Sequence, residues 1–536
     1  MMLASLGLLL AGSATAHAYE SRLIPFRDVG ERDWSAEPIY QLAAVQAIDG
    51  YADGGFRPLA AMSREEFIKM MTAASGAVPG EQGETVKLKD VDPDRWSYPM
   101  IEAALQRRWV DALVDSDGNF QPDVPIRREE VAYAMGAMLL SEAADADRKQ
   151  WLDGGWEKER DARAFPDAAQ VDAPLAPYAY YAVKQGMLEG SDSGLNPDDS
   201  LSRQEAAAVI DRLLHRTASA KPLTVTGFYA IQSYNSIERM SLLDQVALGW
   251  WHLAYEGAGK AKLDSAGDPY KFNLPEGWEE VTAAADKSGA AKDLVVFANK
   301  SHDVESFLGD AAARTQFAES LAAVVDDPRY GFSGVCIDFE DLYDEASKDD
   351  FTAFLHEVKA VLNGKKLTVA VPPVYYYKGY DLKAIGAQAD AVILMAYNFL
   401  SKADRLPSSP LPLVAESVRD TLAAGVPKEK LILGIGKKTD QFIGAGAEAG
   451  YASPASSAVE ERLKKAGVAQ SLSIPYLNRH IQFTDTADNE LFYEDADSID
   501  RKIWVARYYG LKGVALWYMG QFVDSDWQRI AAVRQR

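Results

Sequence analysis

Short apolar runs, rich in β-branched and aromatic residues, alternate with longer helical stretches over residues 224–536. Eight of these runs read VTGFYAI, QVALGWW, DLVVFAN, SGVCIDFE, KLTVAVP, DAVILMAY, KLILGIG and GVALWYM. Strands that are apolar on both faces are typical of parallel sheets whose two faces are covered. Eight such strands separated by helices predict one parallel (β/α)8 barrel, a TIM barrel, with a doubly wound sheet as the alternative.

The chain before residue 217 has another pattern, in which a pair of amphipathic helices recurs three times. Each copy starts at an Asp, passes through a loop rich in Gly, Asp and Pro, and enters its second helix at an Arg. The recurring residues are Asp28, Asp90 and Asp167 at the start, and Arg64, Arg128 and Arg203 at the second helix. This self-similarity predicts three all-α repeats over residues 22–80, 84–142 and 161–216, followed by a linker at 217–223.

In two of the repeats, the residues at the start of the second helix are typical of a helix N-terminus, but the arginine is not. Ser63 and Ser202 have N-cap chemistry, and Glu66 and Glu205 three residues later complete capping boxes. A cation in the first turn opposes the helix dipole, so helix stability does not explain an arginine in all three copies. We interpret the repeated arginine as an anion-binding residue, because its planar guanidinium fits a carboxylate.

The three segments read FRDVGERDW…GGFRPLAAMSREEF, LKDVDPDRW…GNFQPDVPIRREEV and FPDAAQVDA…SGLNPDDSLSRQEA. They resemble S-layer homology (SLH) domains, which have an Asp-Val start, a G-x-F-x-P loop and a Thr-Arg-Ala-Glu helix start. The resemblance implies docking on pyruvylated secondary cell-wall polysaccharide through the three arginines and the three aspartates. Arg127 departs from the family's capping Thr or Ser, and Ala173 stands where the other repeats have Trp34 and Trp96.

Composition restricts where the protein works. Met1 to Ala18 form an apolar run ending in small residues, typical of a secretory signal peptide, although no Lys or Arg precedes the run. The single cysteine excludes an intramolecular disulfide and favours a bacterial envelope over a disulfide-stabilised scaffold. No later segment is apolar enough to span a membrane, so we expect a secreted, cell-surface protein with no transmembrane segment in the mature chain.

The formal net charge of −23 argues against nucleic acid as a partner, because like charges repel over the whole surface. An anionic partner must then be held by local cations. The six histidines are scattered, with no HExxH motif and no Cys/His cluster. We therefore expect neither a metal nor another cofactor.

The run SGVCIDFE holds two carboxylates and the only cysteine of the chain. Side chains alternate between the faces of a strand, so one face carries Gly334, Cys336, Asp338 and Glu340. If that face lines the barrel, burial and mutual repulsion raise at least one carboxyl pKa, as a proton donor requires. The alternative is a carboxylate that caps the following helix. Cys336 is expected to be a small apolar filler, since no base lies beside it.

Several runs resemble strands of glycoside hydrolase family 18. SGVCIDFE is similar to that family's Asp-Gly-x-Asp-x-Asp-x-Glu strand, LMAYN to its Met-x-Tyr-Asp strand, and GVALWYMG to its last strand with a Trp. LTVAVPP and YEDADSIDRKIWVARYYGLKG most resemble the branch that acts on peptidoglycan and spore cortex. The resemblance covers residues 225–527.

This resemblance implies retaining, substrate-assisted catalysis. Glu340 would protonate the glycosidic oxygen while the N-acetyl carbonyl of the substrate attacks the anomeric carbon, and would then act as base for water. Asp338 and Tyr397 would hold the acetamido group, and Trp517 would form the floor under the reacting sugar. No enzyme nucleophile is needed, so the rule that relates carboxylate separation to stereochemistry does not apply.

Three positions depart from the family pattern, namely Ser333, Cys336 and Asn398. A neutral thiol is a poor hydrogen-bond partner for Asp338, so we expect slow recycling of the acid. Further substrate-binding residues are expected at Trp251, Tyr376, Trp517 and Asn398, with core packing as the alternative for the tryptophans. The segment from Thr439 to Asp497 is expected to form a lid or wall beside the cleft.

We therefore expect an exported, wall-anchored hydrolase of β-1,4-linked N-acetylglucosamine polymers, with peptidoglycan favoured over chitin. The alternative is a catalytically weak or inactive barrel that binds carbohydrate, and the retained Glu340 argues against it. A structural surface-layer protein would explain the repeats but would leave the paired carboxylates without a purpose.

Overall fold

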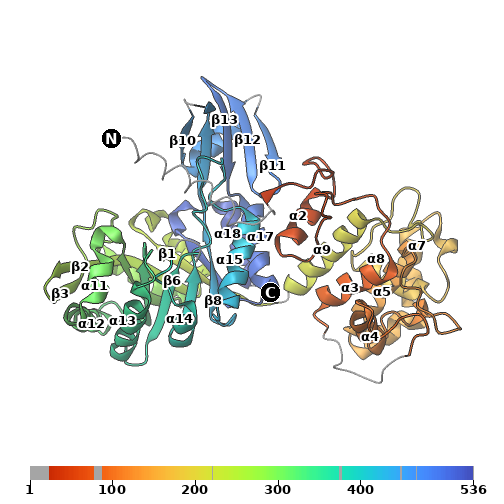
Figure 1. The fold of residues 1–536 in the computed structure, drawn as a ribbon, viewed down its shortest axis with the longest axis horizontal. Coiled ribbons are helices and arrows are strands. Elements are labelled where there is room, and N and C mark those ends of the chain that lie inside the picture. Colours follow the sequence, from red (N-terminus) through yellow and green to blue (C-terminus); the bar gives the residue numbers. More distant parts are fainter. Residues whose placement is uncertain are drawn as a thin grey trace, which may run out of the picture. The chain divides into compact units, whose positions relative to one another are not determined.

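The computed structural model describes residues 23–77, 87–219, 221–373, 377–446, 449–465 and 468–534 (Figure 1). Two compact units divide the chain, Pro25–Thr217 and Ala218–Arg536. The expected signal peptide and Tyr376 lie outside the described residues. None of the helices within those ranges combines the length and the apolar character needed to cross a membrane.

The second unit is built on a closed parallel barrel. Its strands are β1 (Thr224–Tyr229), β2 (Gln245–Gly257), β4 (Ala291–Ala298), β5 (Gly334–Phe339), β6 (Lys366–Val371), β7 (Ala391–Leu394), β8 (Leu431–Gly436) and β14 (Gly513–Trp517). They pair in parallel in the order β1-β14-β8-β7-β6-β5-β4-β2, and β1 also pairs with β2, which closes the ring. Each of the eight apolar runs forms one barrel strand, so the predicted (β/α)8 barrel is confirmed.

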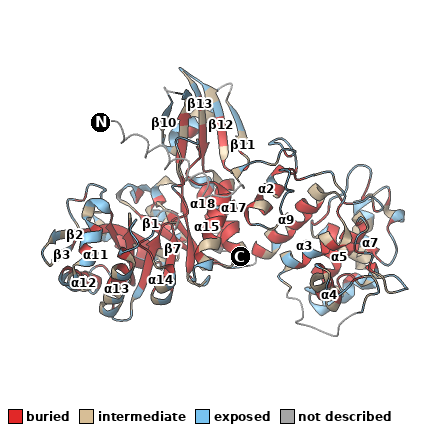
Figure 2. Ribbon diagram, viewed as in Figure 1, coloured by how far each residue is buried: buried red, intermediate tan, exposed pale blue. Residues whose placement is uncertain are grey.

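Helices follow the barrel strands and cover them. They are η5 (Ile231–Leu242), α10 (Trp278–Ser288), α11 (Val304–Gly309), α12 (Ala311–Val325), α13 (Ser347–Val361), α14 (Leu382–Gln388), α15 (Leu411–Ala423), α17 (Ala496–Tyr508) and α18 (Asp524–Arg534). The buried positions of Figure 2 follow the barrel strands and the inward sides of these helices. Strands covered in this way need apolar side chains on both faces, which is the pattern of the sequence.

Two antiparallel additions extend the barrel. Strand β3 (Lys260–Asp264) forms a hairpin with β2. The segment after β8, expected as a lid or wall, contains a five-stranded antiparallel sheet in the order β10-β9-β13-β12-β11 and one helix. Its elements are β9 (Thr439–Ile443), β10 (Gly450–Ala452), α16 (Ser456–Leu463), β11 (Ala469–Leu472), β12 (Arg479–Thr484) and β13 (Asp488–Tyr493). It has an apolar cluster of its own, around Ile481 and Leu491.

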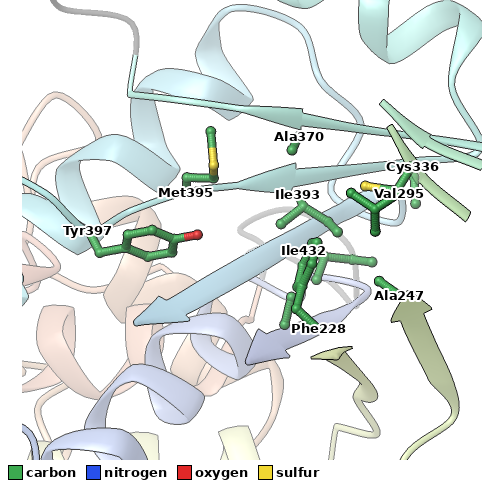
Figure 3. Packing of buried hydrophobic residues seen from close by; sticks show 11 residues of the cluster. Phe228, Ala247, Val295, Cys336, Ala370, Ile393, Met395, Tyr397 and Ile432 are labelled. Carbon is green, nitrogen blue, oxygen red and sulfur yellow. The ribbon is translucent and has the colours of Figure 1, made fainter. Parts of the chain in front are cut away.

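The barrel interior is filled by small and apolar side chains from successive strands (Figure 3). Cys336 of β5 lies in this cluster, opposite Val295 of β4 in the strand register and together with Ala370 of β6, and its side chain is buried. Burial raises the pKa of the Cys336 thiol well above its ordinary value, so the thiol is neutral. The predicted role of Cys336 as an apolar filler is confirmed.

A buried carboxyl group lies lower in the same interior, near the amino ends of the strands. Asp293 of β4 is 1% exposed and accepts hydrogen bonds from the side chains of Gln245 and Thr368, while its Oδ1 has no partner among the described residues. Gly334 makes room for it, since a Cβ there would lie 2.8 Å from Asp293 Oδ1. Burial raises the pKa of Asp293 to about 7.

The first unit contains three pairs of helices. They are α2 (Ala36–Ala44) with α3 (Arg64–Ser75), α4 (Tyr98–Gln106) with α5 (Arg128–Ser141), and α8 (Ala176–Lys184) with α9 (Arg203–Ser219). Between the second and third pairs lie α6 (Asp145–Gln150), the π-helical turn η3 (Trp151–Gly155) and α7 (Trp156–Arg163). The capping box of Ser63 and Glu66 is present, and Glu205 accepts from the backbone N–H and hydroxyl of Ser202. Because α9 continues to Ser219, the expected linker starts inside a helix.

The three pairs are joined in a cycle by main-chain hydrogen bonds. The N–H of Met62 donates to Leu201 O, the N–H of Leu201 donates to Ile126 O, and the N–H of Ile126 donates to Met62 O, all at 2.9 Å. These residues stand just before the second helices of the three repeats. The first repeat therefore contacts the last as directly as it contacts the second.

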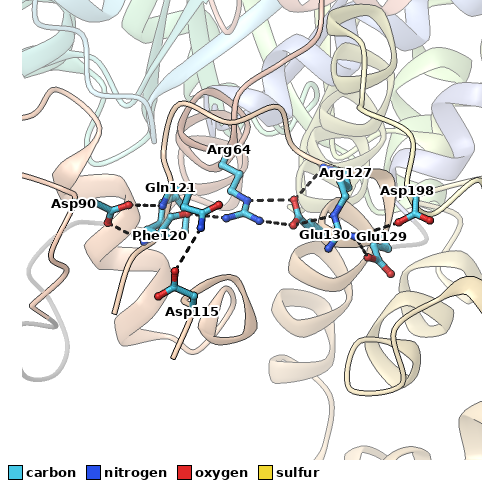
Figure 4. A network of polar contacts seen from close by, with 9 residues as sticks. All are labelled: Arg64, Asp90, Asp115, Phe120, Gln121, Arg127, Glu129, Glu130 and Asp198. Carbon is cyan, nitrogen blue, oxygen red and sulfur yellow. Dashed lines mark hydrogen bonds and ion pairs between the residues drawn. The ribbon is translucent and has the colours of Figure 1, made fainter. Parts of the chain in front are cut away.

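The repeated arginines follow the same cycle. Arg64 Nη1 donates to Phe120 O of the second repeat at 2.9 Å, Arg128 Nε to Leu195 O of the third at 2.8 Å, and Arg203 Nε to Phe56 O of the first at 3.0 Å. Arg64 also pairs with the buried Glu130 (Figure 4). Crossing to the next repeat gives each arginine a structural purpose that the sequence pattern did not suggest.

We predict that Asp293→Asn removes a pH-dependent loss of stability from the barrel. The raised pKa of Asp293 means that the native state holds this proton more tightly than the unfolded state, so the free energy of unfolding falls as pH rises from about 4 to about 7. Thermal unfolding at pH 8 should show a more stable variant, by up to about 4 kcal/mol, with little change at pH 4. Asp349→Asn, at an exposed carboxylate, is the control. If the stabilities of wild type and Asp293→Asn changed with pH in the same way, the raised pKa of Asp293 would be contradicted.

A second prediction concerns Arg64. Arg64→Met leaves Glu130, whose side chain is 2% exposed, with Arg127 as its remaining cation. We expect the free energy of unfolding of the first unit to fall by about 3 kcal/mol, measured in the full chain as faster hydrogen exchange in α5. Arg108→Met is the matched control, because Arg108 is 84% exposed, and it should change stability by less than about 0.5 kcal/mol. Equal protection of α5 from hydrogen exchange in Arg64→Met and Arg108→Met would show that the ion pair between Arg64 and Glu130 does not stabilise the unit.

Candidate functional site

Strand β5 delivers two carboxyl groups to the carboxyl end of the barrel. Asp338 is two residues beyond the interior Cys336, and Glu340 follows the last residue of the strand. Asp338 is 2% exposed, and its Oδ1 has no hydrogen-bond partner in the described ranges. The main-chain N–H of Glu340 donates to Ala298 O of β4 at 2.7 Å, which holds the residue against the neighbouring strand. The site thus contains a buried acceptor without a donor.

Both carboxyl groups hold their protons more tightly than usual. Burial, and then the charge of Glu340, raise the pKa of Asp338 well above its ordinary value. Burial also raises the pKa of Glu340 to about 7, with Asp341 adding to the shift and Lys438 opposing it. The expected rise in pKa is confirmed, with desolvation as the larger cause. At neutral pH the pair retains a proton, which general acid catalysis requires.

The residues immediately after the site side chains have left-handed backbones. Asp341, after Glu340, has φ of 63°, and Asn398, after Tyr397, has φ of 74°. Asp and Asn tolerate this region better than most residues, but it remains less favourable than the extended or helical regions. Strain of this kind collects where side chains must be held in fixed directions, and both sites of strain border the carboxyl end of the barrel.

Tyr397, just after β7, and Trp517, at the end of β14, reach the same interior from other strands of the barrel. Burial, and then the charges of Asp338 and Glu340, raise the pKa of Tyr397 well above its ordinary value, so the phenol stays protonated. Two glycines of β8 make room for its ring, since a Cβ at Gly436 would lie 3.0 Å from Tyr397 Cγ. Trp517, the last residue of β14, is half-buried and packs edge-on against Phe228 at 5.1 Å between ring centroids. Its peptide bond to Tyr518 is cis.

Trp251, expected to bind substrate, lies elsewhere. Its side chain is 3% exposed and packs edge-on against Tyr330 and Phe332, which precede β5. A register shift in the pairing of β2 with β4 lies between Leu248 and Trp251, so strand alternation does not give its direction. Trp251 is a core residue in this structure, and we leave it out of the substrate-binding set.

The tyrosine-rich loop after β6 does present an aromatic surface. Tyr377 stacks on Tyr343 with 5.1 Å between ring centroids, and Tyr343 is 48% exposed. The Tyr343 hydroxyl donates to Asp341, the residue next to Glu340. A stacked pair with one exposed ring, close to the candidate acid, suits the flat face of a sugar ring. Tyr343 was not anticipated from the sequence, although its position three residues after Glu340 could have suggested it.

Sequence reasoning also missed Lys438. This residue follows β8, and its Nζ donates to Asn398 Oδ1. The cation lowers the pKa of Glu340, which places it within electrostatic reach of the candidate acid. The adjacent Lys437 forms a buried ion pair with Asp526. The signal available in the sequence was a pair of lysines directly after an apolar strand.

The three repeated arginines of the first unit differ in their partners. Arg64 pairs with Glu130 at 2.5 Å and Arg128 with Glu205 at 2.6 Å. Arg203 forms no ion pair with any described residue; it donates to Phe56 O and Asp49 O and lies over the rings of Tyr51 and Phe56. Of the three guanidinium charges, that of Arg203 is left without a carboxylate.

The three repeated aspartates tie each loop to its own repeat. Asp28 accepts from the N–H groups of Phe56 and Arg57, and Asp90 accepts from those of Phe120 and Gln121. Asp167 does the same with Leu195 and Asn196. These bonds explain the recurrence of the aspartates structurally, and a contact with polysaccharide stays a prediction.

A pocket of about 540 Å³ lies in the first unit around Arg128. Its lining includes Trp34, which is 61% exposed, and Arg212, whose guanidinium donates to Met187 O and lies 3.7 Å from Glu189. An exposed indole and a half-exposed guanidinium offer stacking and anion-binding chemistry in one place.

Comparisons with known proteins agree with the two halves of the fold. The S-layer homology domain model matches residues 25–68 and 164–207, which are the first and third expected repeats. The middle repeat makes the same cyclic contacts, through Ile126 and Arg128. The Surface-layer 125 kDa protein of Lysinibacillus sphaericus is 28% identical over 215 residues, which cover 38% of this chain and 17% of that protein.

The Cortical fragment-lytic enzyme of Bacillus subtilis (strain 168) is 25% identical over 217 residues, covering 37% of this chain and 49% of the enzyme. The alignments thus span about half or less of the length of these curated relatives. Among solved structures, the spore cortex-lytic enzyme SleL of Bacillus cereus is similar with a TM-score of 0.50 and 19% identity, over 59% of this chain and 75% of that one. The Group IV chitinase of Ostrinia furnacalis has a TM-score of 0.50 and 17% identity, over 59% and 100%. At these identities the structures support the fold.

The family model of glycosyl hydrolases family 18 matches residues 227–521, more than half of the chain. The matched range contains seven of the barrel strands and the last three residues of β1, together with the carboxyl pair of β5, Tyr397 and Trp517. With fold, site and family model in agreement, the chain belongs to glycosyl hydrolases family 18.

Proposed function

We propose that this protein is a glycoside hydrolase that cleaves β-1,4-linked, N-acetylated glycans by retaining, substrate-assisted catalysis. The observation that carries the proposal is the buried Asp338 Oδ1 without a hydrogen-bond donor, beside a glutamic acid that retains its proton near pH 7. A buried acceptor left unpaired is costly. The N–H of a substrate acetamido group would supply the missing donor.

In the proposed mechanism Glu340 donates its proton to the glycosidic oxygen, and the leaving sugar departs as an alcohol. The acetamido carbonyl oxygen attacks the anomeric carbon and forms a cyclic oxazolinium. Asp338 accepts from the acetamido N–H and stabilises the positive charge that develops on this group, while the Tyr397 hydroxyl donates to it. Glu340, now a carboxylate, takes a proton from water as the water opens the ring. Trp517 provides the apolar floor under the reacting sugar.

Peptidoglycan is the polymer that we favour over chitin. Support comes from the similarity to the Cortical fragment-lytic enzyme and from the repeats of the first unit, which are suited to a cell-wall location. A catalytically weak, carbohydrate-binding barrel is the alternative, which the neutral Cys336 beneath Asp338 favours. The raised pKa of Glu340 argues for the enzyme, because a site that only binds has no need of a proton donor.

We further propose that the first unit anchors an exported protein to the cell surface by binding a pyruvylated secondary wall polysaccharide. Arg203 is the favoured carboxylate receptor, since its charge has no acidic partner in the described chain and it lies against the exposed Tyr51. The pocket at Arg128, with Trp34 and Arg212, would hold further sugar units. The chain's net charge of −23 makes such local cations necessary for any anionic partner.

Glu340→Gln should lower kcat on N-acetylated glycan by about 10³-fold without changing thermal stability or wall binding. For the wild type, kcat/KM should fall as pH rises through about 7, because the donor must be protonated. Release of reducing ends from peptidoglycan strands and from chitin oligomers measures both effects. A de-N-acetylated oligomer is the matched control, since it lacks the attacking carbonyl and should resist hydrolysis. Unchanged turnover by the glutamine variant would exclude Glu340 as the acid.

Arg203→Gln should weaken binding of the full chain to purified pyruvylated wall polysaccharide by about 10-fold or more. Removing pyruvate should weaken wild-type binding to a similar extent and leave the variant unaffected, because both changes delete the same ion pair. Arg108→Gln, which removes an exposed guanidinium of the same unit, should bind like wild type. Equal binding by wild type and Arg203→Gln in a pull-down or calorimetric titration would rule out Arg203 as the receptor.

A further inference from the structure

Two adjacent lysines at the carboxyl end of β8 have different electrostatic surroundings. Lys437 is 6% exposed and forms an ion pair with Asp526, which is fully buried. Lys438 is half-buried, and its only hydrogen bond among the described residues goes to the neutral amide oxygen of Asn398. One lysine is neutralised inside the protein, and its neighbour is not.

The acidic groups around Lys438 do not neutralise it. Glu340 and Asp440 act on its charge, yet neither lies within ion-pair distance in the described structure. Asp440 accepts hydrogen bonds from the N–H and hydroxyl of Ser408 and from the Tyr451 hydroxyl, at 2.7 to 2.8 Å. Glu340 holds a proton near neutral pH. Burial accordingly lowers the pKa of Lys438.

Lys438 contacts Asn398, the residue after Tyr397, and lies within electrostatic reach of Glu340. Substrate-assisted cleavage builds a positive charge on the sugar ring and the acetamido group beside Glu340. A lysine within electrostatic reach of Glu340 opposes that charge unless a negative group arrives with the substrate. Asn398 extends the same surface, because its amide N–H₂ makes no hydrogen bond with any described residue while its oxygen accepts from Lys438. Ammonium and amide N–H groups together suit a carboxylate.

We propose that Lys438, assisted by Asn398, binds a carboxylate substituent of the glycan next to the scissile bond, so that the preferred substrate is an acidic N-acetylated glycan. This inference rests on the hydrolase activity proposed above and narrows its substrate class. The Lys438 ammonium and the Asn398 amide form the receptor, and Lys437 has a structural role. Neutral N-acetylglucosamine oligomers are then poorer substrates of the same catalytic residues.

The test compares two substrates of equal length: an N-acetylated oligosaccharide with carboxylate substituents, and the same oligosaccharide after its carboxylates are reduced to alcohols. The wild type should prefer the acidic form by about 10-fold in kcat/KM. Lys438→Met should lose most of that preference, measured as the ratio of the two kcat/KM values, through a higher KM on the acidic form. Any rise in the pKa of Glu340 in this variant acts on both substrates alike and leaves the ratio unchanged. Lys438→Arg should retain the preference, and added salt should diminish it in the wild type.

Lys437→Met is the control for structural damage, and it should lower thermal stability and affect both substrates equally. Three outcomes would overturn the inference: a wild type without preference, an equal loss on both substrates in Lys438→Met, or a shift of the kcat/KM pH profile on both substrates that accounts for the loss. The last result would make Lys438 a positioning residue that acts through Glu340. Failure of the proposed function looks different, because the wild type would then cleave neither substrate or Glu340→Gln would remain active.

Discussion

Closure of the barrel determines which side chains of β5 are buried in its interior. Once β1 pairs with both β2 and β14, every second residue of β5 faces an interior from which water is excluded. The thiol of Cys336 can be buried there at little cost. The carboxyl group of Asp338, two residues further along the strand, is costly to bury unless it is protonated or binds a ligand. The chemistry at Asp338 and Glu340 thus depends on where the strand ends. The two carboxyl groups are buried enough to retain a proton, and they lie close enough to the end of the barrel for a substrate to reach them.

Side chains of the same type have different roles in this protein, depending on whether a carboxylate pairs with them. Arg64 and Arg128 pair with glutamates of the next repeat, and Arg203, in the corresponding place, does not. Lys437 and Lys438 differ in the same way, since Asp526 neutralises the first. Arg203 and Lys438 form no ion pair with any described residue, and both lie on surfaces where an anionic carbohydrate is proposed to bind.

The barrel and the inner face of β5 were predictable from the sequence because apolar runs and strand alternation are local properties. Each of the eight runs became a strand, and Cys336 entered the core as expected. Trp251 was not predictable, because a register shift in β2 breaks the alternation before it. The Lys438 contact with Asn398 joins two loops separated by a whole helix and strand. The acceptors of the repeated arginines depend on cyclic closure, which a linear alignment of repeats does not reveal.

The ring of main-chain bonds through Met62, Ile126 and Leu201 gives the first unit no free end. In a linear repeat protein, a terminal copy can be lost while the others keep most of their contacts, because each copy touches only its neighbours. Here each repeat is a neighbour of both others, so deleting any one removes two of the three interfaces and two of the three arginine contacts. The cycle of contacts therefore requires three repeats. The loops and the insert before the third repeat can change in evolution, but adding or removing a single repeat would break the cycle.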